Sequence, residues 1–186
     1  MNKASYILAA INDSQAIIRA TDTKAAALLA ALIIPISSIE KIFSYFVKLS
    51  SCHLTLFLGS LFTLFWLLAF YTVIKAISSI DNPSQHINDC DGAKGSFHLG
   101  GLFELGERDI FINSNKVKST KNLNIVIDDY PSEINDIAKE LSFEHMKLVY
   151  IRDIKTHRLL ASIKFSILAL LVGLVVFLVV TFFQNQ

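Results

Sequence analysis

Apolar residues gather in three stretches of the chain, and two of these stretches are long enough to cross a lipid bilayer. Residues 165–183 form nineteen consecutive positions without a charged side chain, and fifteen of them are Leu, Ile, Val or Phe. Each such residue favours insertion by about 0.3–0.6 kcal/mol near the bilayer centre, which gives about 5–9 kcal/mol for the stretch. Residues 54–74 are twenty-one uncharged positions, enough to cross a hydrocarbon layer of about 30 Å as a helix. Both stretches predict transmembrane helices.

The third stretch, residues 25–39, has only fifteen uncharged positions. It reaches across a bilayer if a flanking side chain such as Lys24 or Lys41 extends toward the lipid headgroups. Pro35 predicts a kink, which a packed neighbouring helix tolerates, and residues 54–74 supply that neighbour in a hairpin. We therefore expect a mainly α-helical integral membrane protein with three transmembrane helices.

The distribution of Lys and Arg predicts how these spans are oriented. Three spans put the N-terminus and the segment between residues 75 and 158 on one side of the membrane, where they carry fourteen Lys and Arg residues. The loop at residues 40–53, on the other side, carries only Lys41 and Lys48. Positive charge is in excess in cytoplasmic segments, so the N-terminus and the central region are expected in the cytoplasm and the C-terminus in the periplasm. The two cysteines, Cys52 and Cys90, then lie on opposite sides of the membrane.

The N-terminal segment, residues 1–24, is predicted to be a cytoplasmic amphipathic helix. Ile7, Ile11 and Ile18 are spaced to share one face, with Leu8 beside them. We expect this helix to continue into the first span and to pack on a second cytoplasmic helix. Such a small cytoplasmic core indicates that the membrane or a homo-oligomer completes it.

That second helix is predicted at residues 131–162. Asp128 or Asp129 is its expected cap and Pro131 suits its first turn, whereas residues 123–127 fit either a short strand or a further helical turn. Its apolar residues form a seam at Ile134, Ile137, Leu141, Leu148 and Ile151. The whole chain is thus divided into the N-terminal helix at 1–24, the hairpin at 25–77, a loop or sensor region at 78–130, the long helix at 131–162 and the last span at 163–184.

One acidic residue lies where the first helix enters the apolar region. An unpaired charge at this depth costs free energy, so a partner of opposite charge is expected. The residue is Asp22, next to Lys24, and the basic residues of the long helix come to the same depth. We hypothesise that an ion pair, Asp22–Lys155 or Asp22–Arg158, couples the N-terminal helix to the long helix. A carboxylate that is exposed to the lipid headgroups is an equal alternative. The residues expected at this coupling are Asp22, Lys24, Arg152, Lys155 and Arg158.

No pattern of catalytic residues is present, so we expect no enzyme, no cofactor and no metal site. The chain lacks the nucleophile-elbow, zincin, P-loop and dinucleotide-binding motifs. His86, Cys90 and His98 are too irregularly spaced for a zinc prediction. The formal net charge of +1 gives no reason to expect nucleic acid, and 53% hydrophobic residues agree with a membrane protein.

Three short motifs resemble the transmembrane effectors of Pycsar antiphage systems. Residues 21–30, TDTKAAALLA, are similar to the D-x-K-A motif that opens the first span in that family. Residues 101–106, GLFELG, match its aromatic-glycine patch, and residues 155–159, KTHRL, match the basic motif before its last span, with His157 where the family often has an aromatic residue. The order of these features along the chain matches as well.

The resemblance implies an effector in the bacterial inner membrane that senses cyclic CMP or cyclic UMP and damages the membrane to abort phage infection. The cyclic nucleotide would be an activating ligand, and the lipid bilayer and further copies of the chain would be the other partners. The phosphate of the nucleotide needs a cation, and its base needs an aromatic ring on which to stack. The candidates for ligand binding are Lys94, Phe103, Arg108, Lys116 and Lys118. The alternative is a membrane anchor or scaffold that recruits a protein through its cytoplasmic helix.

Overall fold

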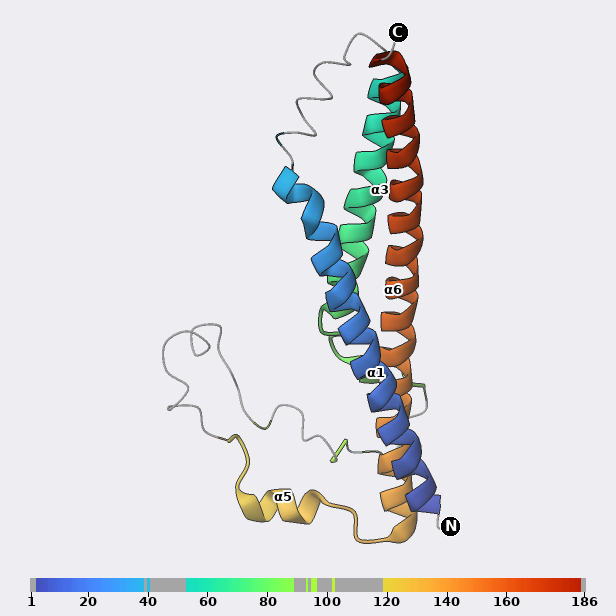
Figure 1. The fold of residues 1–186 in the computed structure, drawn as a ribbon. Helices are drawn as coiled ribbons and strands as arrows, with labels where there is room; N and C mark the ends of the chain where they lie inside the picture. Colours follow the sequence, from blue (N-terminus) through green and yellow to red (C-terminus); the bar gives the residue numbers. More distant parts are fainter. Residues whose placement is uncertain are drawn as a thin grey trace. The chain divides into compact units, whose positions relative to one another are not determined.

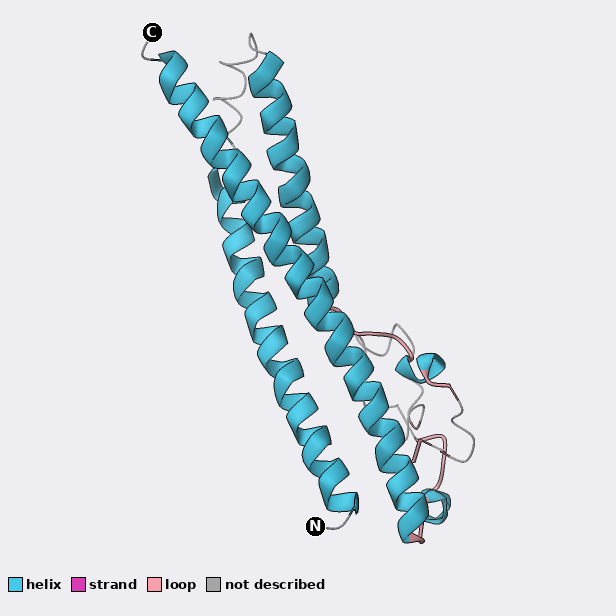
Figure 2. Cartoon of the chain, turned by 90° about the vertical axis from the view of Figure 1, so that its right-hand side faces the viewer, coloured by secondary structure: helices cyan, strands magenta, loops and turns pink. Residues whose placement is uncertain are grey.

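The computed structural model describes residues 3–38, 40, 53–88, 93, 95–96, 102 and 119–184. Nearly all of these residues are helical, and no strand occurs among them (Figures 1 and 2). The helices are α1 (Lys3–Ile33), α3 (His53–Ile77), α5 (Leu123–Asp129) and α6 (Ile134–Gln184), with two 3-10 segments, η1 (Ile34–Ser38) and η2 (Pro83–His86). The prediction of a mainly helical protein is confirmed. Within the described residues, α3 and α6 are long and apolar enough to cross a membrane.

The chain divides into two compact units. Unit 1 consists of Met1–Gln15 and Asn82–Tyr150, and unit 2 consists of Ala16–Asp81 and Ile151–Gln186. Helices α1 and α6 each contribute one part to unit 1 and another part to unit 2. The two units therefore share two continuous helices.

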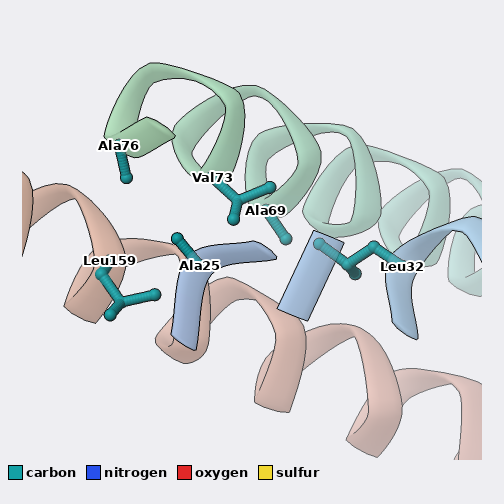
Figure 3. Packing of buried hydrophobic residues seen from close by; sticks show 6 residues of the cluster. All are labelled: Ala25, Leu32, Ala69, Val73, Ala76 and Leu159. Atoms are coloured by element: carbon teal, nitrogen blue, oxygen red, sulfur yellow. The ribbon is translucent and has the colours of Figure 1, made fainter. Parts of the chain in front are cut away.

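Unit 2 is a three-helix bundle made by α3 and by the parts of α1 and α6 that belong to this unit (Figure 1). Three alanines, Ala25, Ala69 and Ala76, are fully buried in its core, and small side chains of this kind allow helices to approach closely in a membrane. Figure 3 shows how the cluster is assembled from the three helices, with Ala25 and Leu32 from α1, Ala69, Val73 and Ala76 from α3, and Leu159 from α6.

The α-helix α1 ends within the first apolar stretch, residues 25–39. α1 stops at Ile33, and Pro35 lies in the 3-10 segment that follows. Proline has no amide hydrogen to bond the carbonyl four residues earlier, and it disfavours the α conformation of the residue before it. The α-helical part of α1 therefore ends two residues before Pro35, and the kink at Pro35 stays a prediction.

The core of unit 1 joins the start of α1 to the start of α6. Ile7 and Ile11 are buried against Ala138 and Leu141, with Ala4, Ile137 and Leu148 packed around them. The seam predicted in the long helix is therefore covered by α1 over most of its length, although Ile134 at its start is 69% exposed. Leu8 does not belong to the buried face as predicted, because its side chain is 42% exposed. The buried positions of α1 in this unit are 7, 11 and 14.

The start of the long helix differs from the prediction. Asp128 and Asp129 end α5, and Tyr130 follows in an extended conformation. α6 begins at Ile134, where the amide of Ile137 donates to the carbonyl of Glu133 at 2.9 Å. Residues 123–127, for which the sequence left strand and helix open, are helical. Pro131 precedes α6 and is not part of its first turn.

Candidate functional site

Unit 1 contains a pocket of about 460 Å³, within the range of sites that hold small molecules. α6 forms one wall with side chains spaced three and four residues apart, which share one face of a helix. The start of α1 and the segment after η2 supply the rest. The lining residues are Lys3, Ile87, Asn88, Ala93, Asn135, Ala138, Lys139, Ser142, Phe143 and Met146.

Two ammonium groups border the pocket. Lys3 comes from the first turn of α1 and Lys139 from the second turn of α6. Lys139 also lies 3.3 Å from Asp136, but both side chains are half exposed, and such a surface pair is weak. The ammonium group of Lys139 is therefore available to an anion that enters the pocket.

The aromatic ring that lines the pocket, Phe143, is contacted by a lysine of the same helix. The ammonium of Lys147 lies 4.7 Å from the centre of the Phe143 ring, a cation–π distance. Lys147 in turn pairs with Glu144, whose side chain is 1% exposed. Gly95 lies near the same ring, because a methyl group on its Cα would be in ordinary van der Waals contact with Phe143, at 3.8 Å. Phe143 therefore has a cation and a glycine as neighbours where it lines the pocket.

Neutral polar groups complete the lining. Asn88 and Asn135 bring two carboxamides, each with donors and an acceptor. The hydroxyl of Ser142 donates to the carbonyl of Ala138 at 2.7 Å, so only its oxygen lone pairs remain for a ligand. Together with two ammonium groups and one aromatic ring, this lining fits a small anion that carries a planar ring.

The residues predicted to bind the ligand lie outside the described residues. These are Lys94, Phe103, Arg108, Lys116 and Lys118. Lys3, Lys139 and Phe143 were not among the residues predicted to bind a ligand. A usable signal was the separation of Lys139 and Phe143 by four residues on a predicted helix, which places a cation and an aromatic ring side by side.

A second group of polar contacts lies in the bundle of unit 2. The ammonium of Lys155 on α6 is 2.6 Å from a carboxylate oxygen of Asp22 on α1. The Lys155 side chain is 9% exposed and the Asp22 side chain 40% exposed. The structure thus brings together the first of the two pairs proposed from the sequence.

The other residues that were expected to couple the N-terminal helix to the long helix make different contacts. Arg158 donates to the carbonyl of Lys75 in the last turn of α3, at 2.8 Å. Arg152 bonds its own neighbour Asp153 at 2.9 Å, and Lys24 is exposed on α1. The alternative Asp22–Arg158 pair is not formed.

Two neutral side chains add links between the same helices. The hydroxyl of Ser162, which is fully buried, donates to the carbonyl of Ala69 at 2.7 Å. The indole nitrogen of Trp66 donates to the carbonyl of Leu32 at 3.1 Å, in the last turn of α1, where carbonyls lack partners within the helix. Every pair of helices in the bundle is therefore connected by a side-chain hydrogen bond.

In the comparisons with known proteins, no family model, no curated protein and no solved structure matches the chain.

Proposed function

We propose that the chain is a multi-pass protein of the bacterial inner membrane that binds a cyclic pyrimidine mononucleotide in the cytoplasm and responds by impairing the membrane. The ligand is cyclic CMP or cyclic UMP, the outcome is abortive infection, and the chain carries out no catalytic step. The observation that carries the ligand-binding part is the pocket of unit 1, where Lys3, Lys139 and Phe143 border one volume of about 460 Å³.

The apolar surface of the long helices supports the membrane part of the proposal. Only 17% of the apolar window of α3 and 6% of that of α6 is buried within the structure. Large side chains such as Leu170 and Phe177 are 72% and 65% exposed. A soluble protein rarely leaves an apolar surface of this extent in water, whereas a lipid environment covers it.

The packing of unit 1 supports a third span. Ile7 and Ile11 pack on Ala138 and Leu141 in the same unit, so the N-terminal segment and the segment after α3 lie on the same side of any membrane. If α3 crosses the bilayer, these two segments share a side only when the chain crosses once more between residues 15 and 53. The apolar second half of α1 with η1 is the segment available for that crossing.

The chemistry of the pocket supports the nature of the ligand. A cyclic nucleotide carries one negative charge on its phosphate and one planar base. Lys3 and Lys139 suit the phosphate, the ring of Phe143 suits stacking with the base, and Asn88 and Asn135 suit its hydrogen-bonding edge. The residues expected from the sequence remain further candidates.

The shared helices supply a route from ligand to membrane. Lys3 is on α1, Lys139 and Phe143 are on α6, and these same helices carry Asp22 and Lys155 in the bundle. A ligand shifts the bundle only if it binds one arrangement of the two helices more tightly than the other. In the proposed mechanism the bound nucleotide favours an arrangement in which the bundle, as a homo-oligomer, lets ions pass.

The alternative role, a scaffold that recruits a partner through the long helix, is less well supported. Leu141 and Ile137 of that seam already pack on α1. A partner that used the same seam would have to displace Ile7 and Ile11.

Membrane potential in bacteria tests the proposal. Cells that express the chain also produce cyclic CMP, cyclic UMP or cyclic AMP, and a voltage-sensitive dye reports depolarisation. We expect depolarisation with one pyrimidine nucleotide, none with cyclic AMP, and a reduced response for Lys139→Gln. Lys121→Gln is the matched control, because Lys121 belongs to unit 1 but pairs with Asp129 away from the pocket. Depolarisation that does not depend on the nucleotide, or no response to any of them, would refute ligand gating.

A further inference from the structure

Two basic residues, Lys75 of α3 and Arg158 of α6, are joined by a hydrogen bond in unit 2. On α3, Lys75 is the first charged residue after the uncharged run of residues 54–74. On α6, Arg158 is followed by five uncharged residues, 159–163, and then by Lys164, which directly precedes the uncharged run of residues 165–183. The guanidinium of Arg158 donates to the backbone carbonyl of Lys75 at 2.8 Å, which places the end of the α3 run beside Arg158 of α6.

Neither charge of this pair has a counter-charge within the part of the chain that the structure describes. Among the described residues, no carboxylate pairs with Lys75 or with Arg158, whereas the nearby Lys155 and Arg152 pair with Asp22 and Asp153. Lys75 is exposed, with its ammonium 6.0 Å from the centre of the Tyr71 ring. The guanidinium of Arg158 has five N–H donors, and the bond to the Lys75 carbonyl uses one of its nitrogens. Donors of both side chains are therefore left for an external anion.

We propose that Lys75 and Arg158 form a binding site for the headgroup of an anionic phospholipid at the α3–α6 seam. A phosphodiester accepts two parallel hydrogen bonds from a guanidinium and an ion pair from an ammonium group. Tyr71, 59% exposed one turn before Lys75, is of the type that lies at headgroup level. The site goes beyond the proposed function, since it assigns a lipid partner, and it rests only on the membrane placement within that function.

A headgroup at this position would act on the bundle. It would bridge the last turn of α3 to α6 next to the Asp22–Lys155 pair, because Lys155 and Arg158 are one helical turn apart. The lipid would thus stabilise the arrangement of helices described for unit 2. Its effect is separate from nucleotide binding, since the pocket belongs to unit 1.

Native mass spectrometry of the full chain, extracted from a mixture of phosphatidylglycerol and phosphatidylcholine, tests the site. We expect the wild type to retain phosphatidylglycerol in preference, and Lys75→Gln and Arg158→Gln to lose about tenfold of that preference. Lys24→Gln is the matched control: it removes an exposed positive charge next to Asp22 on α1 without touching the pair, so the preference should remain.

Two results would overturn the proposal. If Lys24→Gln lowers lipid retention as much as Lys75→Gln does, the surface attracts lipid only through its net charge. If inorganic phosphate displaces the phosphatidylglycerol, the pair is a site for free phosphate. Within the described residues, the ammonium of Lys75 pairs with no carboxylate and lies beside the Tyr71 ring, so Lys75→Gln tests the site even if Arg158→Gln weakens the fold. A failure of nucleotide gating leaves all these results unchanged, which distinguishes the two proposals.

Discussion

Lys155 and Asp22 form an asymmetric ion pair. Their charged atoms lie 2.6 Å apart across 133 positions of sequence, but the lysine side chain is 9% exposed and the aspartate 40% exposed. The ammonium has lost most of its contact with water, whereas the carboxylate keeps much of its own. The two residues are therefore not equivalent as sites of mutation.

We expect Asp22→Asn to destabilise the bundle by about 1–2 kcal/mol, because it leaves a buried ammonium without its counter-charge. The value is below that of a fully buried pair because Asp22 is partly solvated. Lys155→Met should cost less, since it leaves a carboxylate that water can reach. Denaturant titration in detergent, with the double variant, checks this through a coupling free energy of about 1 kcal/mol. Equal losses for both single variants, or additive losses in the double variant, would contradict the asymmetry.

Two adjacent alanines on α1 should differ strongly in their tolerance of a larger side chain. Ala25 is fully buried against α3 and α6, whereas Ala26 is exposed. Ala25→Leu should destabilise the bundle by about 1–3 kcal/mol or more, because the helix backbones must separate to admit the larger side chain. Ala26→Leu is the matched control and should change the stability by no more than about 0.5 kcal/mol. Thermal unfolding in detergent distinguishes them, and similar melting temperatures would argue against this packing.

A hydrogen bond between helices and one within a helix can be compared on α6. Ser162 donates to Ala69 of α3, and Ser166 donates to Ser162 of its own helix at 2.8 Å. Ser162→Ala should lower the stability by about 0.6 kcal/mol, the average for such bonds in membranes. Ser166→Ala should have a smaller effect, because its bond does not connect two helices. Unfolding by a denaturing detergent measures the difference, and the opposite order would contradict the link.

The helices, the Asp22–Lys155 pair and the pocket differ in how far they could be predicted from the sequence. The apolar runs predict α3 and the last part of α6, because a helix that is apolar on all sides has no place on the surface of a soluble protein. For Asp22 the sequence left two possibilities, a pair with Lys155 or Arg158 and an exposed carboxylate, because both lower the cost of a charge at that depth. The packed face of α3 was not predictable, since apolar residues occupy all sides of it and periodicity does not distinguish Ala69 and Val73 from their neighbours. The pocket was missed for a different reason. Lys3 and Lys139 are far apart in the sequence, and only tertiary packing brings them to the same pocket.

Variants of the pocket should separate the two parts of a ligand. Lys139→Gln removes one positive charge and should weaken the binding of a cyclic pyrimidine nucleotide about tenfold, with a smaller dependence on salt. Phe143→Leu keeps an apolar wall but removes the stacking surface, at a cost of about 1–3 kcal/mol of binding free energy. Lys121→Gln is the control for net charge. Calorimetric titration of the purified chain measures all three, and unchanged affinity in both pocket variants would place the ligand elsewhere.

The number of spans can be decided by cysteine labelling, because the chain has only two cysteines. Asp13 is exposed in the part of α1 that belongs to unit 1, so Asp13→Cys reports the side of the N-terminus in a chain from which Cys52 and Cys90 have been removed. With three spans, a membrane-impermeant maleimide should label this cysteine only after the inner membrane is opened. In the same topology, Cys52 retained alone should be labelled without that step, because the loop before α3 then faces the periplasm. Labelling of both cysteines from the periplasm would mean that α1 does not cross. The packing of Ile7 on Leu141 predicts the opposite, because it requires both residues to lie on the same side of the membrane.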